Sequence, residues 1–211
     1  MSLKLYNFLS RKIEDFVPID SKNIGLYTCG PTVYDYVHIG NWRTFIFEDI
    51  LKRVLLFNGY KVKHVMNITD IDDKIIKKAK DQNVDYKKIT SRYEKIFFED
   101  LSKLNIIPAD NYPRATEHIT AMIRIIEVLL NKGFAYKGDD GVYFAVDKFK
   151  NYGKLSGLEK RDLKKGARVN ADLYDKESWA DFALWKFPSS TSSLAKATDD
   201  KKVLEGEPSW E

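Results

Sequence analysis

The spacing of apolar residues predicts a strand, a helix and a second strand near the start of the chain. Segment 23–28 has the sequence Asn-Ile-Gly-Leu-Tyr-Thr and predicts a short buried strand, and segment 61–68 predicts another. Between them, apolar residues at helical spacing predict a helix over 41–58, which ends where Gly59 accepts a left-handed conformation. The residues expected on its core-facing side are Phe47, Ile50, Leu51, Val54 and Phe57. Such a βαβ unit implies parallel strands and a right-handed crossover.

Three more helices follow from the same spacing. One covers 72–80, and a second covers 86–104 with Asp85 as its N-cap. A third runs over 116–132, with Thr116 as its cap and Gly133 at its end. The expected buried residues are Ile89, Tyr93, Ile96, Phe97, Leu101 and Leu104 in the second helix and Ile119, Ile123, Ile126 and Leu130 in the third.

The pattern changes after Gly133. Segments 134–137 and 142–146 predict a β-hairpin around Gly138-Asp139-Asp140-Gly141. We therefore predict an α/β fold in which residues 1–114 form the first half of a doubly wound parallel sheet. Residues 115–178 are expected to form an inserted α+β connective subdomain, and residues 179–211 to return toward the first domain. The sheet is expected to be incomplete within this sequence.

Composition excludes several classes of protein. A chain of 211 residues with 44% hydrophobic and 31% charged residues is typical of a soluble globular protein. It contains no apolar run of membrane-spanning length and no secretory signal pattern, so no membrane partner is expected. A net charge of +4 permits RNA binding but does not indicate it. The single cysteine excludes an internal disulfide and fits a reducing cytoplasm, where we expect the protein to act.

Candidate chemistry gathers at the predicted strand ends. Cys29 follows the first strand and Thr69 the second, and open α/β sheets bind ligands beyond the carboxyl ends of their strands. His38-Ile39-Gly40-Asn41 enters the crossover helix, whose N-terminus suits a phosphate. Gly40 leaves room for a nucleotide, and His38 can donate a hydrogen bond to a phosphate oxygen. Without further context, a lone histidine at a helix start is more often a cap or a packing residue. A lone cysteine is more often a small, buried apolar residue.

Several motifs together resemble the cysteinyl-tRNA synthetases, a family of class I aminoacyl-tRNA synthetases. His38-Ile39-Gly40-Asn41 corresponds to the class I "HIGH" motif, from which it departs at Asn41. The other matching segments are 27–35 (Tyr-Thr-Cys-Gly-Pro-Thr-Val-Tyr-Asp), 67–74 (Asn-Ile-Thr-Asp-Ile-Asp-Asp-Lys), 113–116, 166–169, 181–186 and 206–210. The resemblance implies a Rossmann-like class I catalytic domain. It also implies activation of cysteine by ATP with magnesium, and transfer of cysteine to its tRNA.

The resemblance also implies roles for individual residues. Cys29 would be one of four ligands of a single zinc ion that binds the substrate thiolate. The implied substrate contacts are Gly30, Thr69 and Asp70; the implied ATP contacts are Pro31, Thr32, His38, Gly40 and Asn41; and His38 and Asn41 are the implied catalytic residues. Asp72 and Asp73 are expected to favour a helix N-terminus, as is Asp70, rather than to bind a metal.

Zinc would solve a problem of discrimination. Telling cysteine from serine by size yields only about 1–3 kcal/mol, whereas ten-thousandfold discrimination needs about 5.5 kcal/mol. Zinc prefers a thiolate to a neutral hydroxyl and can supply the difference.

Parts of the family pattern have no counterpart in this sequence. The other zinc ligands and the Lys-Met-Ser-Lys-Ser loop are missing, so we expect an N-terminal portion of a monomeric synthetase with little activity alone. Two alternatives stay open, namely a ligase that joins cysteine to an amino sugar and a non-catalytic fragment that binds a nucleotide or RNA.

Overall fold

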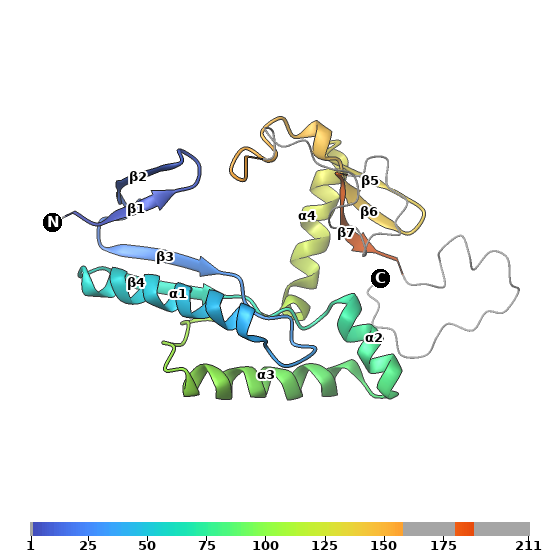
Figure 1. Ribbon diagram of the computed structural model, residues 1–211. Coiled ribbons are helices and arrows are strands. Elements are labelled where there is room, and N and C mark those ends of the chain that lie inside the picture. The colour runs from blue at the N-terminus through green and yellow to red at the C-terminus, as the bar shows by residue number, and fades with distance from the viewer. Residues whose placement is uncertain (1, 158–179, 188–211) are drawn as a thin grey trace, which may run out of the picture. The chain divides into compact units, whose positions relative to one another are not determined.

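Two parallel strands lie at the centre of the predicted βαβ unit. In the computed structural model, which describes residues 2–157 and 180–187, β3 (Asn23–Thr28) pairs in parallel with β4 (Lys61–Met66). Helix α1 (Ile39–Phe57) connects the two strands (Figure 1). The predicted strand–helix–strand unit is therefore confirmed, with shifted ends.

A third parallel segment lies along the other edge of β4. Isolated bridges join Val65 to Asn111 and Ile68 to Arg114, and Ile68 N donates to Pro113 O at 2.9 Å. The chain reaches this segment through α2 (Asp73–Gln82) and α3 (Tyr86–Lys103). The sequence did not predict it as a strand because proline has no N–H to donate to a ladder. β4 is thus the middle of three parallel segments, as expected for the start of a doubly wound sheet.

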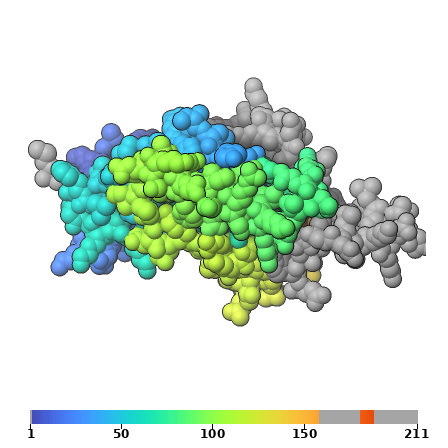
Figure 2. Space-filling model, turned by 90° about the horizontal axis from the view of Figure 1, so that it is seen from below, coloured from blue at the N-terminus to red at the C-terminus, as the bar shows by residue number. Residues whose placement is uncertain are grey.

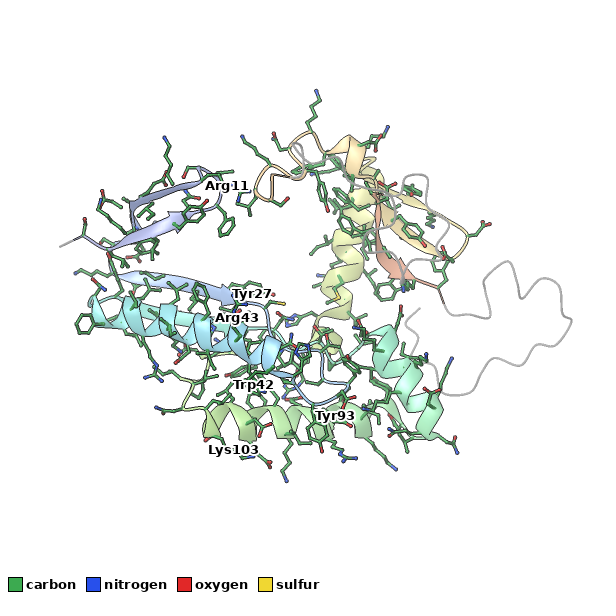
Figure 3. All side chains as sticks on the ribbon, in the orientation of Figure 1. Arg11, Tyr27, Trp42, Arg43, Tyr93 and Lys103 are labelled. Carbon is green, nitrogen blue, oxygen red and sulfur yellow. The ribbon has the colours of Figure 1, made fainter. Side chains whose placement is uncertain are left out.

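Helices α1 and α3 cover one face of this sheet. Trp42 and Phe45 of α1 pack against Phe97 of α3, and the Trp42 and Phe97 rings stack with centroids 5.6 Å apart. Figure 3 labels Trp42 on α1. Met66 and Ile68 belong to the same core, and residues two apart along a strand share a face. On the outside, α3 lies beside α2 (Figure 2).

The predicted buried face of α1 is wrong. Phe47, Ile50 and Phe57 are 68%, 52% and 92% exposed, while Leu51 and Val54 are half-buried. The buried residues of the helix are instead Trp42, Phe45, Asp49, Lys52 and Leu55.

Polar contacts explain this orientation of α1. The Asp49 carboxylate accepts from Ile107 N at 2.9 Å, and Lys52 Nζ donates to Pro108 O at 2.7 Å. Arg53 pairs with Asp49 at 2.6 Å and also donates to Asn105 O. The polar side of α1 therefore binds the backbone of 105–108, which leads into the third parallel segment.

Strand β3 is buried on one face rather than on both. Ile24 and Thr28 are buried, whereas Asn23, Gly25 and Tyr27 on the opposite face are exposed among the residues described. The expectation of a fully buried strand is therefore wrong for this part of the chain.

The predicted helix ends are mostly confirmed. Asp85 caps α3 by accepting from Lys87 N at 2.8 Å, and Gly133 follows α4 (Ile119–Asn131) with a φ of 74°. Thr116 does not cap that helix, because it lies inside the 3₁₀ helix η1 (Ala115–His118) that precedes α4. Leu104 is 43% exposed at the end of α3, contrary to the prediction.

The chain divides into two compact units, the first formed by residues 1–4 and 15–119 and the second by residues 5–14 and 120–211. In the second unit β5 (Ala135–Lys137) and β6 (Gly141–Phe144) form the predicted hairpin, and β7 (Phe182–Lys186) pairs with β6. The 3₁₀ helix η2 (Val146–Lys148) follows the hairpin. Asp181, next to β7, accepts from Val146 N and from the Tyr136 hydroxyl, both at 2.9 Å.

Near the N-terminus, β1 (Lys4–Asn7) and β2 (Lys12–Asp15) pair as a small separate sheet. The predicted segment boundaries at residues 114 and 178 stay a prediction. Among the helices that the structure describes, none is long and apolar enough to cross a membrane.

The orientation of α1 can be tested by a matched pair of substitutions. Asp49→Ala should lower the free energy of unfolding by about 1–3 kcal/mol, because the half-buried Ile107 N–H loses its acceptor. Ile50→Ala, one residue further and exposed, should change it by less than about 0.5 kcal/mol. Urea denaturation measures both, and the reverse order of effects would contradict the orientation described.

Candidate functional site

The candidate site begins where β3 ends. Thr28 is the last residue of the strand, and Cys29 follows it with an exposed side chain. The Cys29 sulfur lies 3.8 Å from Gly30 O, a weak contact within its own backbone. The thiol is therefore accessible, and the alternative of a small buried cysteine is excluded.

Backbone hydrogen bonds bring Thr69 to the same place. Thr69 N donates to Pro31 O at 3.0 Å, and Val33 N donates to Thr69 O at 3.1 Å. Thr32 and Thr69 form an isolated parallel bridge, so the pairing of the two strands continues past their ends. The structure thus brings Pro31, Thr32 and Thr69 together, as their predicted positions at the strand ends require.

Gly30 lies unusually close to the segment after β4. A Cβ atom at this position would be 1.7 Å from Asn67 O, so a side chain cannot fit without moving the backbone. The Asn67 Oδ1 atom accepts from Gly30 N at 3.2 Å and from the Tyr27 hydroxyl at 3.0 Å. The sequence analysis did not single out Asn67, although a polar residue directly after a parallel strand is a signal for this kind of site.

His38 caps helix α1. Its Nδ1 atom accepts from Gly40 N at 3.1 Å, so in the neutral ring the proton is on Nε2. A Cβ atom on Gly40 would lie 2.9 Å from His38 Cε1, so the glycine makes room for this ring. The cap and the proposed phosphate contact are compatible because they use different ring nitrogens.

Asn41 lies in the first turn of α1 and is exposed. Asn41 N and Trp42 N both donate to His38 O, at 3.0 and 3.2 Å. Trp42 is buried in the core, in keeping with a packing role.

Asp70 is buried and binds a different element from the one expected. Its carboxylate accepts from Thr116 N at 3.0 Å and from the Thr116 hydroxyl at 2.5 Å, which connects the end of β4 to η1. Asp72, not Asp70, caps α2 by accepting from Lys74 N at 2.9 Å, and Asp73 occupies the first turn. The prediction that Asp70 caps the following helix is therefore wrong, and that for Asp72 is confirmed.

The loop between Cys29 and His38 is held against α2 and α3. Lys78 Nζ lies 3.1 Å from the Asp35 carboxylate and donates to the Tyr93 hydroxyl at 2.9 Å. Tyr36 packs edge-on against Tyr93, with centroids 5.4 Å apart. Burial opposes ionisation of Asp35, but hydrogen bonds from Tyr36 N and Lys78 outweigh it and lower the pKa of the carboxyl.

Beneath Cys29, Thr28 joins a buried polar network. The Thr28 hydroxyl lies 2.9 Å from His64 Nε2, and His64 is 2% exposed. Burial lowers the pKa of His64, and the nearby Lys52 charge adds to this, while Asp110 and Asp49 oppose it. Burial raises the pKa of Glu48, and a hydrogen bond with Thr28 lowers it by a smaller amount.

Within residues 2–157 and 180–187, no three metal-ligating side chains come close enough to hold an ion. Cys29 fits a metal as one soft ligand, and the described residues do not complete a coordination shell around it.

The family described as "tRNA synthetases class I (C) catalytic domain" matches residues 15–210 of this sequence, which is nearly the whole chain. The chain belongs to this class I tRNA synthetase family. The family predicted from the motifs is thereby confirmed, as is the α/β fold class.

Relatives of this synthetase chain include cysteine–tRNA ligases of an archaeon and a bacterium. The chain is 48% identical over 211 residues to the cysteine–tRNA ligase of Pyrococcus horikoshii, and the aligned region covers 100% of this chain and 41% of that relative. It is 54% identical over 187 residues to the cysteine–tRNA ligase of Chlamydia trachomatis serovar D, and the aligned region covers 88% of this chain and 39% of that relative. The chain thus spans about two fifths of the length of these relatives.

Solved class I synthetases share the fold. Mycobacterium tuberculosis methionyl-tRNA synthetase in complex with methionyl-adenylate superposes with a TM-score of 0.51 at 20% identity, over 60% of this chain and 25% of that one. The Agrobacterium radiobacter K84 LeuRS–tRNA–LeuAMS complex gives 0.50 at 21% identity, over 64% and 18%. At this level of identity the likeness concerns the fold alone.

The close approach at Gly30 gives a matched glycine test. Gly30→Ala should lower the free energy of unfolding by about 1–3 kcal/mol, because the backbone of the strand ends must separate. Gly25→Ala, on the exposed face of the same strand with nothing within 4 Å of its Cβ position, should have little effect. Chemical denaturation of both variants checks this, and equal effects would refute the close approach.

The buried His64 should make stability depend on pH. Because burial lowers its pKa in the folded state, the unfolded chain binds more protons below about pH 6.5, and the contribution of His64 is lost as pH falls through the folded pKa. The wild type should therefore lose more stability between pH 7.5 and 5.5 than His64→Gln. The raised pKa of Glu48 acts in the opposite direction in both proteins, so the comparison isolates the histidine. Parallel pH profiles would contradict the assignment.

Proposed function

We propose that this chain forms the cysteine- and ATP-binding part of a cysteine–tRNA ligase. The observation that carries the proposal is the accessible Cys29 thiol on the same loop as His38 at the N-terminus of α1. Membership of the class I family and similarity to cysteine–tRNA ligases support it. The reaction proposed is adenylation of cysteine by ATP, with magnesium, followed by transfer of cysteine to its tRNA.

The ATP phosphates would bind at the start of α1. His38 Nδ1 is occupied by Gly40 N, which leaves the Nε2 proton to donate to a phosphate oxygen as negative charge develops. Asn41 lies in the first turn with an exposed side chain and would act beside it. Pro31, Thr32 and Gly40 would line the nucleotide side of the pocket.

The amino acid would bind at the ends of β3 and β4. Gly30 would contribute backbone contacts and Thr69 its hydroxyl. Asp70 would act indirectly, because its carboxylate is engaged by Thr116.

Cys29 would contribute one thiolate to a zinc ion, one per chain. When bound, zinc would supply selective recognition of a thiolate over a hydroxyl. The described residues hold no group of three or more side chains that could bind the ion, so no reaction step is assigned to the metal. We further propose that the protein acts as a monomer in the cytoplasm.

Cysteine-dependent ATP–pyrophosphate exchange by the protein that the gene encodes tests the proposal. His38→Ala should lower kcat about 10²–10³-fold, as loss of a preorganised transition-state donor does. His118→Ala, an exposed histidine of η1, is the matched control and should leave the rate unchanged. Exchange that survives His38→Ala, or that needs no cysteine, would overturn the proposal.

Product analysis tests one of the two alternatives, the ligase that joins cysteine to an amino sugar. With labelled cysteine, the label should appear on tRNA, and transfer to an amino sugar instead would indicate the other ligase. Cys29→Ser should raise the half-saturating concentration of cysteine and release bound zinc, which metal analysis after dialysis measures.

A further inference from the structure

We propose that Asn67 is a positioning residue for Cys29, and that its amide sets the direction of the thiol and of the Thr69 hydroxyl toward the amino-acid substrate. The proposal deepens the function above and rests on it. Asn67 comes directly after β4, and it is half-buried.

One side chain connects three groups of the site. Asn67 Oδ1 accepts from the Tyr27 hydroxyl at 3.0 Å and from Gly30 N at 3.2 Å, and Nδ2 donates to the Thr69 hydroxyl at 3.3 Å. Tyr27 and Gly30 lie on either side of the Thr28-Cys29 pair in the chain. Asn67 therefore binds a side chain before the thiol and the backbone directly after it.

These partners also determine which way the amide faces. Gly30 N–H can only donate, so the Asn67 atom that meets it must be the carbonyl oxygen. With the amide reversed, an NH₂ group would face that N–H, and the bond to Gly30 would be lost. The orientation therefore follows from chemistry rather than from a choice between two equivalent placements.

Cys29 is the free member of an otherwise anchored segment. Thr28 is fixed by its hydroxyl, 2.9 Å from the buried His64 Nε2, and Gly30 is held so close that a Cβ atom would overlap Asn67 O. The Cys29 side chain itself is exposed, and its described contact is the weak one to Gly30 O. This arrangement suits a ligand or substrate contact, because a fixed backbone limits where the sulfur can be and spares ordering entropy on binding.

The two ends of the amide serve different partners. Its oxygen fixes the backbone beside Cys29, and its NH₂ group orients the hydroxyl of Thr69, two residues further along the same segment. A shift of the amide would change both at once, so the effect should fall on cysteine rather than on ATP, whose proposed contact at His38 depends on Gly40 and the α1 N-terminus.

The experiment compares Asn67→Ala with a matched control, Asn58→Ala, whose side-chain amide donates to Val54 O at the end of α1. Amide hydrogen exchange of Gly30, followed by NMR in the 211-residue chain, should be about tenfold faster in Asn67→Ala and unchanged in the control. Asn67→Asp keeps the acceptor and should restore protection of Gly30. If Asn67→Ala does not fold, Tyr27→Phe takes its place in these measurements, because it removes a single exposed hydroxyl that donates to Asn67 Oδ1.

Activity supplies the second measurement. In the protein that the gene encodes, Asn67→Ala should raise the KM for cysteine about tenfold in pyrophosphate exchange, with the KM for ATP changed less than about twofold. A purely structural role would raise both constants together, and that result would overturn the proposal. An unchanged rate of amide hydrogen exchange at Gly30 would overturn it as well. Absence of any cysteine-dependent ATP–pyrophosphate exchange in the wild type would refute the proposed function instead, and the amide hydrogen exchange would still decide whether Asn67 holds Gly30.

Discussion

The parallel alignment of β3 with β4 is the constraint on which the candidate site depends. Parallel strands bring their carboxyl ends to the same edge, and backbone bonds from Thr69 to Pro31 and Val33 carry the alignment beyond the last strand residues. Thr32 and Thr69 therefore become neighbours although they lie far apart in the sequence. The crossover helix must start at this edge too, which places the N-terminus of α1 and its cap, His38, on the same loop.

Polar contacts connect α1 and β4 to neighbouring parts of the sheet. Asp49 and Lys52 of α1 bind the backbone of the segment that leads to the third parallel segment, and His64 Nε2 lies 2.9 Å from the Thr28 hydroxyl. Burying such groups costs free energy unless each finds a partner, and here most of the partners are backbone groups of residues 105–108. The same contacts therefore give the buried side chains of α1 their hydrogen-bond partners and also fix the path of the segment they bind.

Much of the fold could be predicted from the sequence. Strand β3, helix α3 with its Asp85 cap and the hairpin of β5 and β6 are local structures, and local periodicity and turn chemistry predict them. The face of α1 could not be predicted in this way. Its apolar residues Phe47, Ile50 and Phe57 have helical spacing, but the buried charged residues on the other side find backbone partners in 105–108. The segment around Pro113 was missed for a related reason, because its pairing with β4 uses few local signals.

By itself, the sequence determined the family, the βαβ unit and the identity of the candidate residues, because these depend on local periodicity and on motifs that are continuous in the chain. It also placed Cys29 and Thr69 at strand ends. Only the tertiary structure decided that Asn67 joins Tyr27, Gly30 and Thr69, that Asp70 binds Thr116, and that His38 uses Nδ1 for its cap. The physical reason is that a hydrogen bond depends on distance and direction in space. Residues far apart in sequence acquire both only when the strands have paired and the helices have packed.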